Sequence, residues 1–209
     1  MNRYDDEIVC ASTIEARQGF TGPLNRSNII TDSLAAFPLL PNTWQVWDAV
    51  GTPIGAPAND DLGIGSGAFA TGCPYISAGD MNGLGSTTRY ARRLFELPAE
   101  YSSGNLIRLN ASGGILAATN VCATSCVVDF ECYVCSRDGL KSGSDLVTTA
   151  ATTINSLTFG EKAFVVTPTG LIPGKILDIR LTITANHNST GTTSIPILGA
   201  VEILLDVKG

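Results

Sequence analysis

The chain ends in the stretch G-A-V-E-I-L-L-D-V-K-G, residues 199–209, in which apolar side chains occur at every second position. One face of this stretch would carry Val201, Ile203, Leu205 and Val207. The other face would carry Glu202, Leu204, Asp206 and Lys208. Because successive side chains of a β-strand point to opposite faces of its sheet, a period of two predicts a half-buried strand with the first set in the core.

The same alternation occurs upstream, in Lys175–Thr184. Its apolar positions are Leu177, Ile179, Leu181 and Ile183. The segment between the two alternating stretches, Ala185–Thr193, reads A-N-H-N-S-T-G-T-T and consists of residues typical of turns. We therefore expect the chain to close with two long antiparallel strands, with His187 as a solvent-exposed residue of the turn.

Shorter alternating segments, separated by Pro- and Gly-rich connections, predict strands through most of the second half. They are Thr87–Leu97, Asn105–Ala111, Ser125–Cys135, Asp145–Ile154, Ala163–Thr167, Lys175–Thr184 and Ile195–Val207, after an earlier strand within 43–50. Several strands at short spacing with turn signals between them are typical of sandwiches and jelly rolls. The predicted fold is therefore all-β, an antiparallel β-sandwich of jelly-roll type.

The beginning of the chain lacks this periodicity. Residues 1–41 show no sustained alternation, and Thr31–Phe37 could start a short helical turn that Pro38 would end. We interpret residues 1–41 as an extended N-terminal arm and residues 42–209 as the sandwich domain.

Charge and hydrophobicity exclude two classes of partner. Hydrophobic residues make up 44% of the chain, charged residues 15%, and the net charge is −6, which does not suit a surface that neutralises phosphates. No apolar run approaches the ~18 residues of a membrane span, and the first ten residues lack the apolar region of a secretory signal. We expect a soluble protein that folds in a reducing compartment and binds neither nucleic acid nor membranes.

Four of the six cysteines form the pattern C-x3-C-x5-C-x2-C, at Cys122, Cys126, Cys132 and Cys135. Structural zinc sites usually place ~12–20 residues between their two ligand pairs, whereas here the spacing is short and lies within a strand pattern. The alternation puts Cys126 and Cys132 on the apolar face, where free cysteines act as small core residues. We interpret the thiols as inert, with zinc and a disulfide such as Cys122–Cys126 as the alternatives.

Candidate acids and aromatic residues do not form a recognisable site. Asp60, Asp61 and Asp80 are candidates for calcium ligands or for the paired carboxylates of a glycosidase, but acids beside Gly and Asn are more often turn formers. No nucleophile accompanies His187 in the manner of a catalytic triad. We predict no catalytic residue, no cofactor and no metal site.

A sugar-stacking platform is a further alternative. Trp44, Trp47 and Tyr75 could provide its rings if they were exposed, although aromatic residues in strands more often belong to the core.

Several segments share a distinctive texture: T-T-R-Y-A-R-R-L-F-E-L-P-A-E-Y (87–101), V-D-F-E-C-Y (128–133), T-P-T-G-L-I-P-G-K-I-L-D-I-R-L-T (167–182) and the terminal stretch 199–209. With W-Q-V-W-D-A and N-D-D-L-G-I upstream, they resemble a group of small tailed-phage and metagenomic virion proteins over about residues 42–209. The resemblance implies a capsid-associated jelly roll, in particular a decoration (cement) protein. Arg93 departs from the texture, since an apolar residue would suit its strand face better.

The resemblance implies a non-enzymatic phage virion protein that binds and stabilises the capsid exterior, after assembly in the host cytoplasm. Its expected partners are the major capsid protein and further copies of itself, as a homotrimer or failing that a dimer. Candidate interface residues are Leu204, Trp44 and Trp47. The alternatives are a host-recognition or carbohydrate-binding jelly-roll module of a tail or fibre, a glycan-degrading enzyme, and a single jelly-roll major capsid protein.

Overall fold

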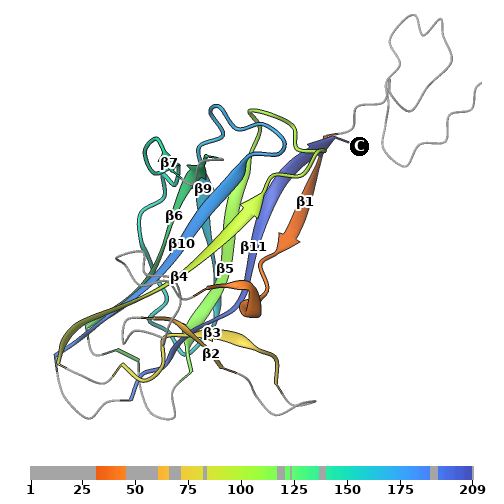
Figure 1. The fold of residues 1–209 in the computed structure, drawn as a ribbon. Coiled ribbons are helices and arrows are strands. Elements are labelled where there is room, and N and C mark those ends of the chain that lie inside the picture. Colours follow the sequence, from red (N-terminus) through yellow and green to blue (C-terminus); the bar gives the residue numbers. More distant parts are fainter. Residues whose placement is uncertain are drawn as a thin grey trace, which may run out of the picture. The chain divides into compact units, whose positions relative to one another are not determined.

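The computed structural model describes residues 32–45, 61–65, 72–81, 84–116, 121–122, 124–136, 140–188 and 193–208. These residues form eleven β-strands and one short 3-10 helix, η2 (Pro41–Thr43), arranged as two antiparallel sheets (Figure 1). No helix among them has the length and apolar character that crossing a membrane requires.

The first sheet is built around the last strand of the chain, and we call it the β11 sheet. Its strand order is β2-β3-β11-β5-β9, and β1 also pairs with β11. The strands are β1 (Asp32–Pro38), β2 (Gly63–Gly65), β3 (Tyr75–Ser77), β5 (Ile107–Ile115), β9 (Gly160–Val166) and β11 (Pro196–Lys208).

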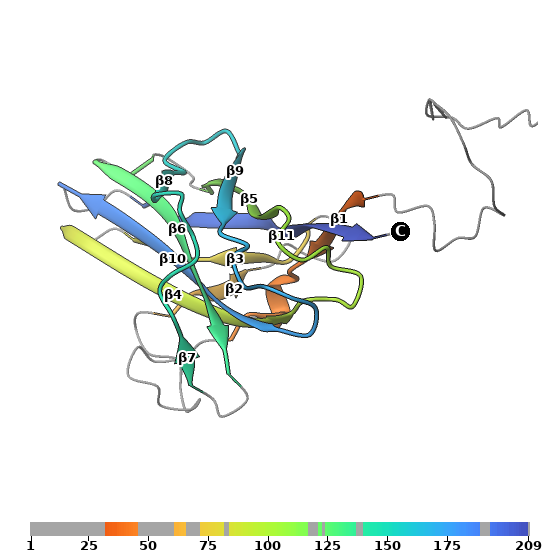
Figure 2. The same cartoon turned by 90° about the horizontal axis from the view of Figure 1, so that it is seen from above.

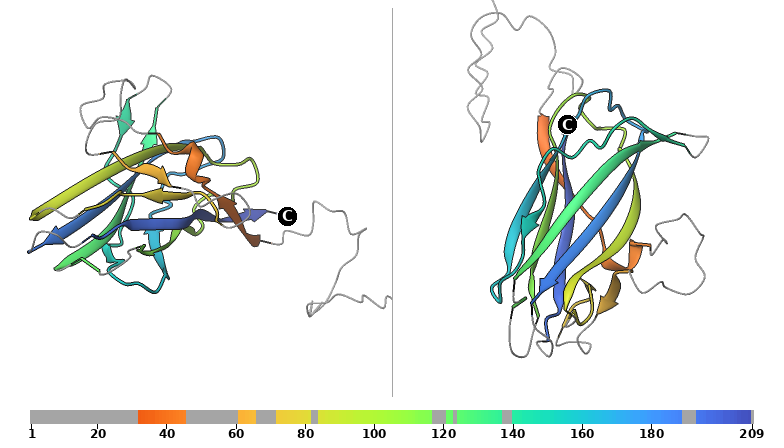
Figure 3. Two further views of the ribbon diagram at one scale, coloured as in Figure 1. Left: turned by 90° about the horizontal axis from the view of Figure 1, so that it is seen from below. Right: turned by 90° about the vertical axis from the view of Figure 1, so that its left-hand side faces the viewer.

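The second sheet, which we call the β10 sheet, has the order β4-β10-β6-β7, and β8 also pairs with β6. Its strands are β4 (Gly85–Glu96), β6 (Ser125–Cys135), β7 (Lys141–Ser142), β8 (Thr152–Thr153) and β10 (Ile176–His187). In the right panel of Figure 3, β6, β10 and β4 lie side by side on the near side of the molecule, and Figure 2 shows the sheets from above.

The order of pairing identifies the topology as a jelly roll. Four antiparallel pairs are nested along the chain: β3 with β11, β4 with β10, β5 with β9 and β6 with β8. Successive pairs alternate between the two sheets. This is the arrangement of a long folded ribbon wrapped around a sandwich, the jelly-roll form of an antiparallel double sheet.

The core lies between the inward faces of the two sheets. Leu177, Ile179, Leu181 and Ile183 of β10 are fully buried, as are Ile203 and Leu205 of β11. Phe130 of β6 contacts Phe164 of β9 across the layer, with ring centroids 4.9 Å apart. The predicted inward faces of both terminal strands are therefore confirmed, with Val207 partly buried at the end of β11.

The predicted strand Ser125–Cys135 is found with the same bounds, but the pairing of the last two strands differs from the expectation. β10 and β11 do not form a hairpin, because β10 is central in one sheet and β11 is central in the other. Both strands carry one fully apolar face, and placing them in opposite sheets directs both faces into the same core.

The helical turn predicted for Thr31–Phe37 is wrong. Residues Asp32–Pro38 form β1 and pair with β11, in a register that runs from Asp32 opposite Lys208 to Pro38 opposite Glu202. The backbone groups of β11 thus find partners that a local helical turn would have left unused. Residues 32–38 consequently belong to the sandwich rather than to the predicted arm, and residues 1–31 lie outside the described residues.

The strand predicted for Asp145–Ile154 is mostly irregular, and only Thr152–Thr153 forms β8. The Asp145 carboxylate instead accepts hydrogen bonds from the backbone N–H groups of Cys132 (2.8 Å) and Val147 (3.0 Å). The earlier strand predicted within 43–50 is represented by one bridge, between Gln45 and Arg92, and residues 46–50 lie outside the described residues.

We expect Leu205→Ala to lower the free energy of unfolding by ~2–5 kcal/mol, because it would leave a cavity at a fully buried position. The neighbouring, half-buried Leu204 points to the opposite face, so Leu204→Ala should cost less than about 1 kcal/mol. Urea unfolding of both variants measures the difference, and equal effects would contradict the assigned faces.

Candidate interaction surface

The outward face of the β10 sheet carries paired charges. Arg92 of β4 forms a two-point ion pair with Asp178 of β10, with its Nε 2.5 Å from one carboxylate oxygen. Next to it, Arg180 pairs with Glu131 of β6. The hydrogen bond to Asp178 is the main reason that the pKa of Arg92 lies above its ordinary value. These two ion pairs lie within the sheet, while Asp129 of β6 on the same face accepts a hydrogen bond from the Phe130 N–H (3.0 Å).

Two tyrosines on this face are covered by cations. The Arg180 guanidinium lies 5.3 Å from the centre of the Tyr90 ring, and the Lys141 ammonium lies 3.1 Å from the centre of the Tyr133 ring. Both are cation–π contacts, in which the ring faces are already occupied.

The outward face of the β11 sheet is more apolar. Pairing places Ala36 of β1 opposite Leu204 of β11, Leu204 opposite Arg108 of β5, and Arg108 opposite Val165 of β9. Val165 is 39% exposed, and Leu34, one pleat away from Ala36 on the same face, is 54% exposed. We call Leu34, Ala36, Leu204 and Val165 the apolar row; Arg108 lies within it, and Asp206 of β11 lies opposite Leu34.

The rest of this face carries further charges, among them Glu202, Asp206 and Lys208 of β11. The adjacent row on the same face, two residues along each strand, consists of Pro38, Glu202, Asn110 and Ala163, which are paired in register. Glu202 accepts a hydrogen bond of 3.4 Å from the Asn110 side chain. Protein interfaces are depleted in charged residues at their centres, and contiguous exposed apolar patches mark interaction sites. The apolar row is the stretch of this face that comes nearest to such a patch.

The three predicted interface residues fall in different places. Leu204 is half-buried on the outward face and belongs to the apolar row. Trp44 is only 7% exposed, packs against Phe130 at a centroid distance of 6.4 Å, and donates its indole N–H to the Leu39 carbonyl (3.3 Å). Its ring is a core side chain of this fold rather than a surface platform, and Trp47 lies outside the described residues.

Arg93 occupies an inward-facing position of β4, opposite Ile179 of β10, at the outer strand of the sheet. Burial lowers the pKa of this arginine, and its guanidinium escapes the apolar layer by donating to the Thr43 hydroxyl. The apolar face that Arg93 seemed to interrupt is therefore the buried one.

The cysteines and the histidine were only partly predicted. Cys126 and Cys132 are fully buried core residues, as expected, and the described cysteines carry free thiols. The prediction that His187 is a solvent-exposed turn residue is wrong, because His187 is the last residue of β10 and only 6% exposed. The inward alternation of β10 extends beyond Ile183 through Ala185 to His187, and the turn-like composition of the segment concealed this extension.

The predicted acids are not gathered into a site. Asp61 makes a parallel bridge with Tyr90, Asp80 accepts a hydrogen bond from the Ser194 N–H (3.3 Å), and Asp60 lies outside the described residues. Among the described residues, no group of three or more His, Cys, Asp or Glu side chains is arranged to hold a metal ion. Tyr75 is half-buried in β3.

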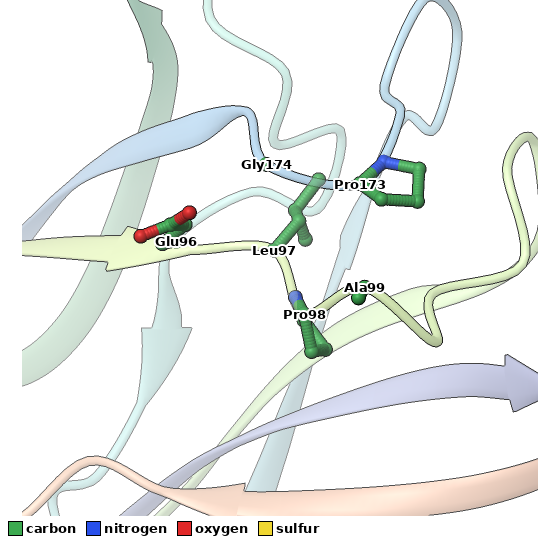
Figure 4. Close-up of a pocket in the computed structure, with 6 residues that line it drawn as sticks. All are labelled: Glu96, Leu97, Pro98, Ala99, Pro173 and Gly174. Atoms are coloured by element: carbon green, nitrogen blue, oxygen red, sulfur yellow. The ribbon is translucent and has the colours of Figure 1, made fainter.

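A groove is formed where the chain leaves β4. Its walls are Glu96, Leu97, Pro98, Ala99, Pro173 and Gly174, shown in Figure 4. Glu96 is its single charged side chain, and the Leu97 carbonyl is engaged by the Gly174 N–H (2.8 Å). Binding pockets for small molecules combine apolar walls with several converging polar groups, and this groove lacks the latter.

Comparison with known proteins adds distant likenesses. Neither a protein-family model nor a curated protein sequence matches the chain. Similar solved structures include the CBM22-1 xylan-binding domain of Paenibacillus barcinonensis Xyn10C, with 11% identity, 71% of this chain and 82% of that chain covered, and a TM-score of 0.40.

Two further similar structures are of different kinds. The mannan-recognising carbohydrate-binding module TmCBM27 has 12% identity, covers 85% of this chain and 97% of its own, and has a TM-score of 0.40. A structure of infectious bursal disease virus, Gx strain, has 12% identity, covers 84% of this chain and 32% of that chain, and has a TM-score of 0.39. At these values the likenesses carry no argument about function, which rests on the surfaces described above.

We expect Arg92→Ala to lower the free energy of unfolding by roughly 1–3 kcal/mol, because it leaves the buried Asp178 carboxylate without its main donor. The expected loss of stability is modest because the Arg92 side chain is 37% exposed and solvent screens the ion pair. Arg180→Ala, in the more exposed pair, should cost less than about 1 kcal/mol. Equal losses on thermal or urea unfolding would contradict the expectation that the more buried ion pair contributes more to stability.

Proposed function

We propose that the protein is a non-enzymatic structural protein of a phage virion, which attaches to the capsid exterior through the outward face of the β11 sheet. The observation that carries this proposal is the contrast between the two sheets. On the β10 sheet two ion pairs tie neighbouring strands together, whereas the β11 sheet exposes the apolar row beside Arg108 and Asp206.

The attachment we propose is multivalent. One row of four apolar side chains gives a weak contact by itself, since binding must first offset lost translational and rotational freedom. Several copies seated around a symmetry axis of a capsid would act together, because each bound copy raises the effective concentration of the next. The net charge of −6 suits the outside of a particle, away from packaged nucleic acid.

The absence of an enzymatic role is part of the proposal. On the outward faces, arginines engage Asp178 and Glu131, and Asn110 donates to Glu202. A hydrolase instead needs an acid and a base held free in a cleft that admits substrate.

A second candidate function is glycan binding by the charged face of the β10 sheet. Tyr90 and Tyr133 present rings on that face, beside carboxylates and guanidinium groups that could accept or donate hydrogen bonds to hydroxyls. A sugar would have to displace Arg180 and Lys141 from the two rings. Glycan binding that is lost in a Tyr90→Ala, Tyr133→Ala double variant would favour this candidate.

We expect Leu204→Asp to leave the fold intact and to abolish attachment to particles that lack the protein. The aspartate would place a charge in the middle of the apolar row, where docking would have to desolvate it. Co-sedimentation of the variant with such particles measures attachment, and thermal unfolding checks the fold.

Val127→Asp is the matched control for this change. Val127 is a half-buried, outward-facing valine of β6 in the opposite sheet, so its substitution adds the same charge to the other face. Normal attachment by Leu204→Asp, or loss of attachment by Val127→Asp alone, would assign the contact to a different surface.

We expect the full chain to form a closed homotrimer, or failing that a dimer, and deletion of residues 1–31 to release monomers. The deletion should stop at residue 31, because residues 32–38 form β1 of the sandwich. Analytical ultracentrifugation at micromolar concentration gives the masses. We expect this because residues 1–31 would link neighbouring copies, and a monomeric full chain, or an oligomer that survives the deletion, would contradict that link.

A further inference from the structure

Two cysteines, a histidine and a serine meet at one end of the sandwich core. Cys126, at the start of the inward face of β6, is fully buried and lies opposite Ala185 of β10. His187 follows Ala185 by two residues on the same inward face, which makes it the diagonal cross-strand neighbour of Cys126. Cys122 is 2% exposed and Ser194 is fully buried. We call these four residues the dithiol cluster.

The backbone holds the two cysteines against one short segment. The Asn155 side chain accepts a hydrogen bond from the Cys122 N–H (2.8 Å) and donates one to the Cys122 carbonyl (3.0 Å). The adjacent Ile154 donates its N–H to the Cys126 carbonyl (2.9 Å). Cys122 and Cys126 are therefore both held against the same segment, residues 154–155.

The cluster makes its two thiols unequal. A hydrogen bond with Cys126 is the main cause that lowers the pKa of Cys122, with smaller contributions from Ser194 and His187. The same hydrogen bond, with burial, raises the pKa of Cys126. By contrast, burial is the main cause that raises the pKa of Cys132, a core thiol outside the cluster, to about 12, with smaller contributions from Asp145 and Asp178.

His187 is the second, independent sign that this cluster has a chemical role. Neither ring nitrogen has a hydrogen-bond partner among the residues that the structure describes, although the side chain is buried. Leaving a buried polar group unsatisfied costs about 1–3 kcal/mol. A hydrophobic residue would fill the same position at the end of the β10 core face without this cost.

We propose that Cys122 and Cys126 are a redox-active dithiol, which hydroperoxides convert to a disulfide, with His187 as the residue that accepts the Cys122 proton. Cys122 is the attacking sulfur and Cys126 the resolving one. The site is a modification site of the folded chain and does not depend on the proposed attachment to a capsid.

The chemistry balances with a hydroperoxide as the oxidant. The Cys122 thiolate attacks the terminal oxygen of the peroxide, the O–O bond breaks, and the departing alkoxide takes the proton held by His187 to become an alcohol. The Cys126 sulfur then attacks the sulfur of the Cys122 sulfenic acid. The S–O bond of the sulfenic acid breaks, and the departing hydroxide takes the Cys126 proton and leaves as water. The two cysteines lose two electrons in total and the peroxide gains them.

The experiment follows oxidation of the reduced full chain by hydrogen peroxide, with the remaining thiols alkylated at intervals. Chymotryptic cleavage after Phe130 separates Cys122 and Cys126 from Cys132 and Cys135, so mass spectrometry reads each pair by itself. We expect the peptide with Cys122 and Cys126 to lose both alkylation sites together and to become lighter by two hydrogen atoms. The Cys132 thiol, also fully buried, should stay alkylatable after unfolding, and it is the internal control.

Two variants separate the roles. Cys126→Ala should stop the reaction at a sulfenic acid on Cys122 that dimedone traps. His187→Gln should retain the disulfide but form it roughly tenfold more slowly at neutral pH, with the half-maximal rate moved to higher pH, because a smaller fraction of Cys122 is thiolate. The wild-type chain alone suffices for the main result if a variant does not fold.

Three outcomes would overturn the inference. The first is that Cys122 and Cys126 remain alkylatable after the exposed Cys73 has been oxidised. The second is that Cys122 forms its disulfide with a cysteine other than Cys126. The third is that the purified chain contains stoichiometric zinc, released by chelation, which would make the cluster part of a metal site. An unchanged rate and pH profile in His187→Gln would remove the histidine from the mechanism.

Discussion

The apolar layer between the two sheets is the interaction on which the rest of the structure depends. β10 and β11 are each central in their sheets, and both present an uninterrupted buried face. β1, β3 and β5 pair with β11, β4 and β6 pair with β10, and the remaining strands extend the two sheets from these. The hydrophobic effect thus fixes which face of each strand is inward, and with it which side chains remain for contacts outside the molecule.

The same constraint explains why the two outward faces differ. On the β10 sheet, the Asp178 side chain is almost fully buried between its neighbours. Its buried carboxylate needs a hydrogen-bond donor, which Arg92 of the adjacent strand provides. On the β11 sheet, Leu204 lies between Ala36 of β1 and Arg108 of β5, and Val165 of β9 lies beyond Arg108. At one end of the core the inward face of β10 finishes on His187, where the apolar layer gives way to the dithiol cluster.

The sequence predicted those features that a local pattern determines. Alternation identified Ser125–Cys135 and the inward faces of both terminal strands, because a buried face must repeat every second residue. It did not predict β1, whose strand conformation comes from pairing with β11, or the placement of β10 and β11 in opposite sheets, which alternation leaves open. The outward position of Leu204 was predictable, because this leucine interrupts the polar face of its strand. The burial of Trp44 and His187 was not predictable, because the residues that cover them are distant in the sequence.

In the function we propose, this jelly roll is a structural component of a particle surface. The most direct test of this function is the number of copies of the chain per purified virion, measured by quantitative mass spectrometry against the major capsid protein. The account predicts a copy number of the same order as that of the capsid protein, as multivalent coverage of the exterior requires. A handful of copies per particle would assign the chain to a tail or a vertex, and its absence from purified particles would contradict a structural role in the virion.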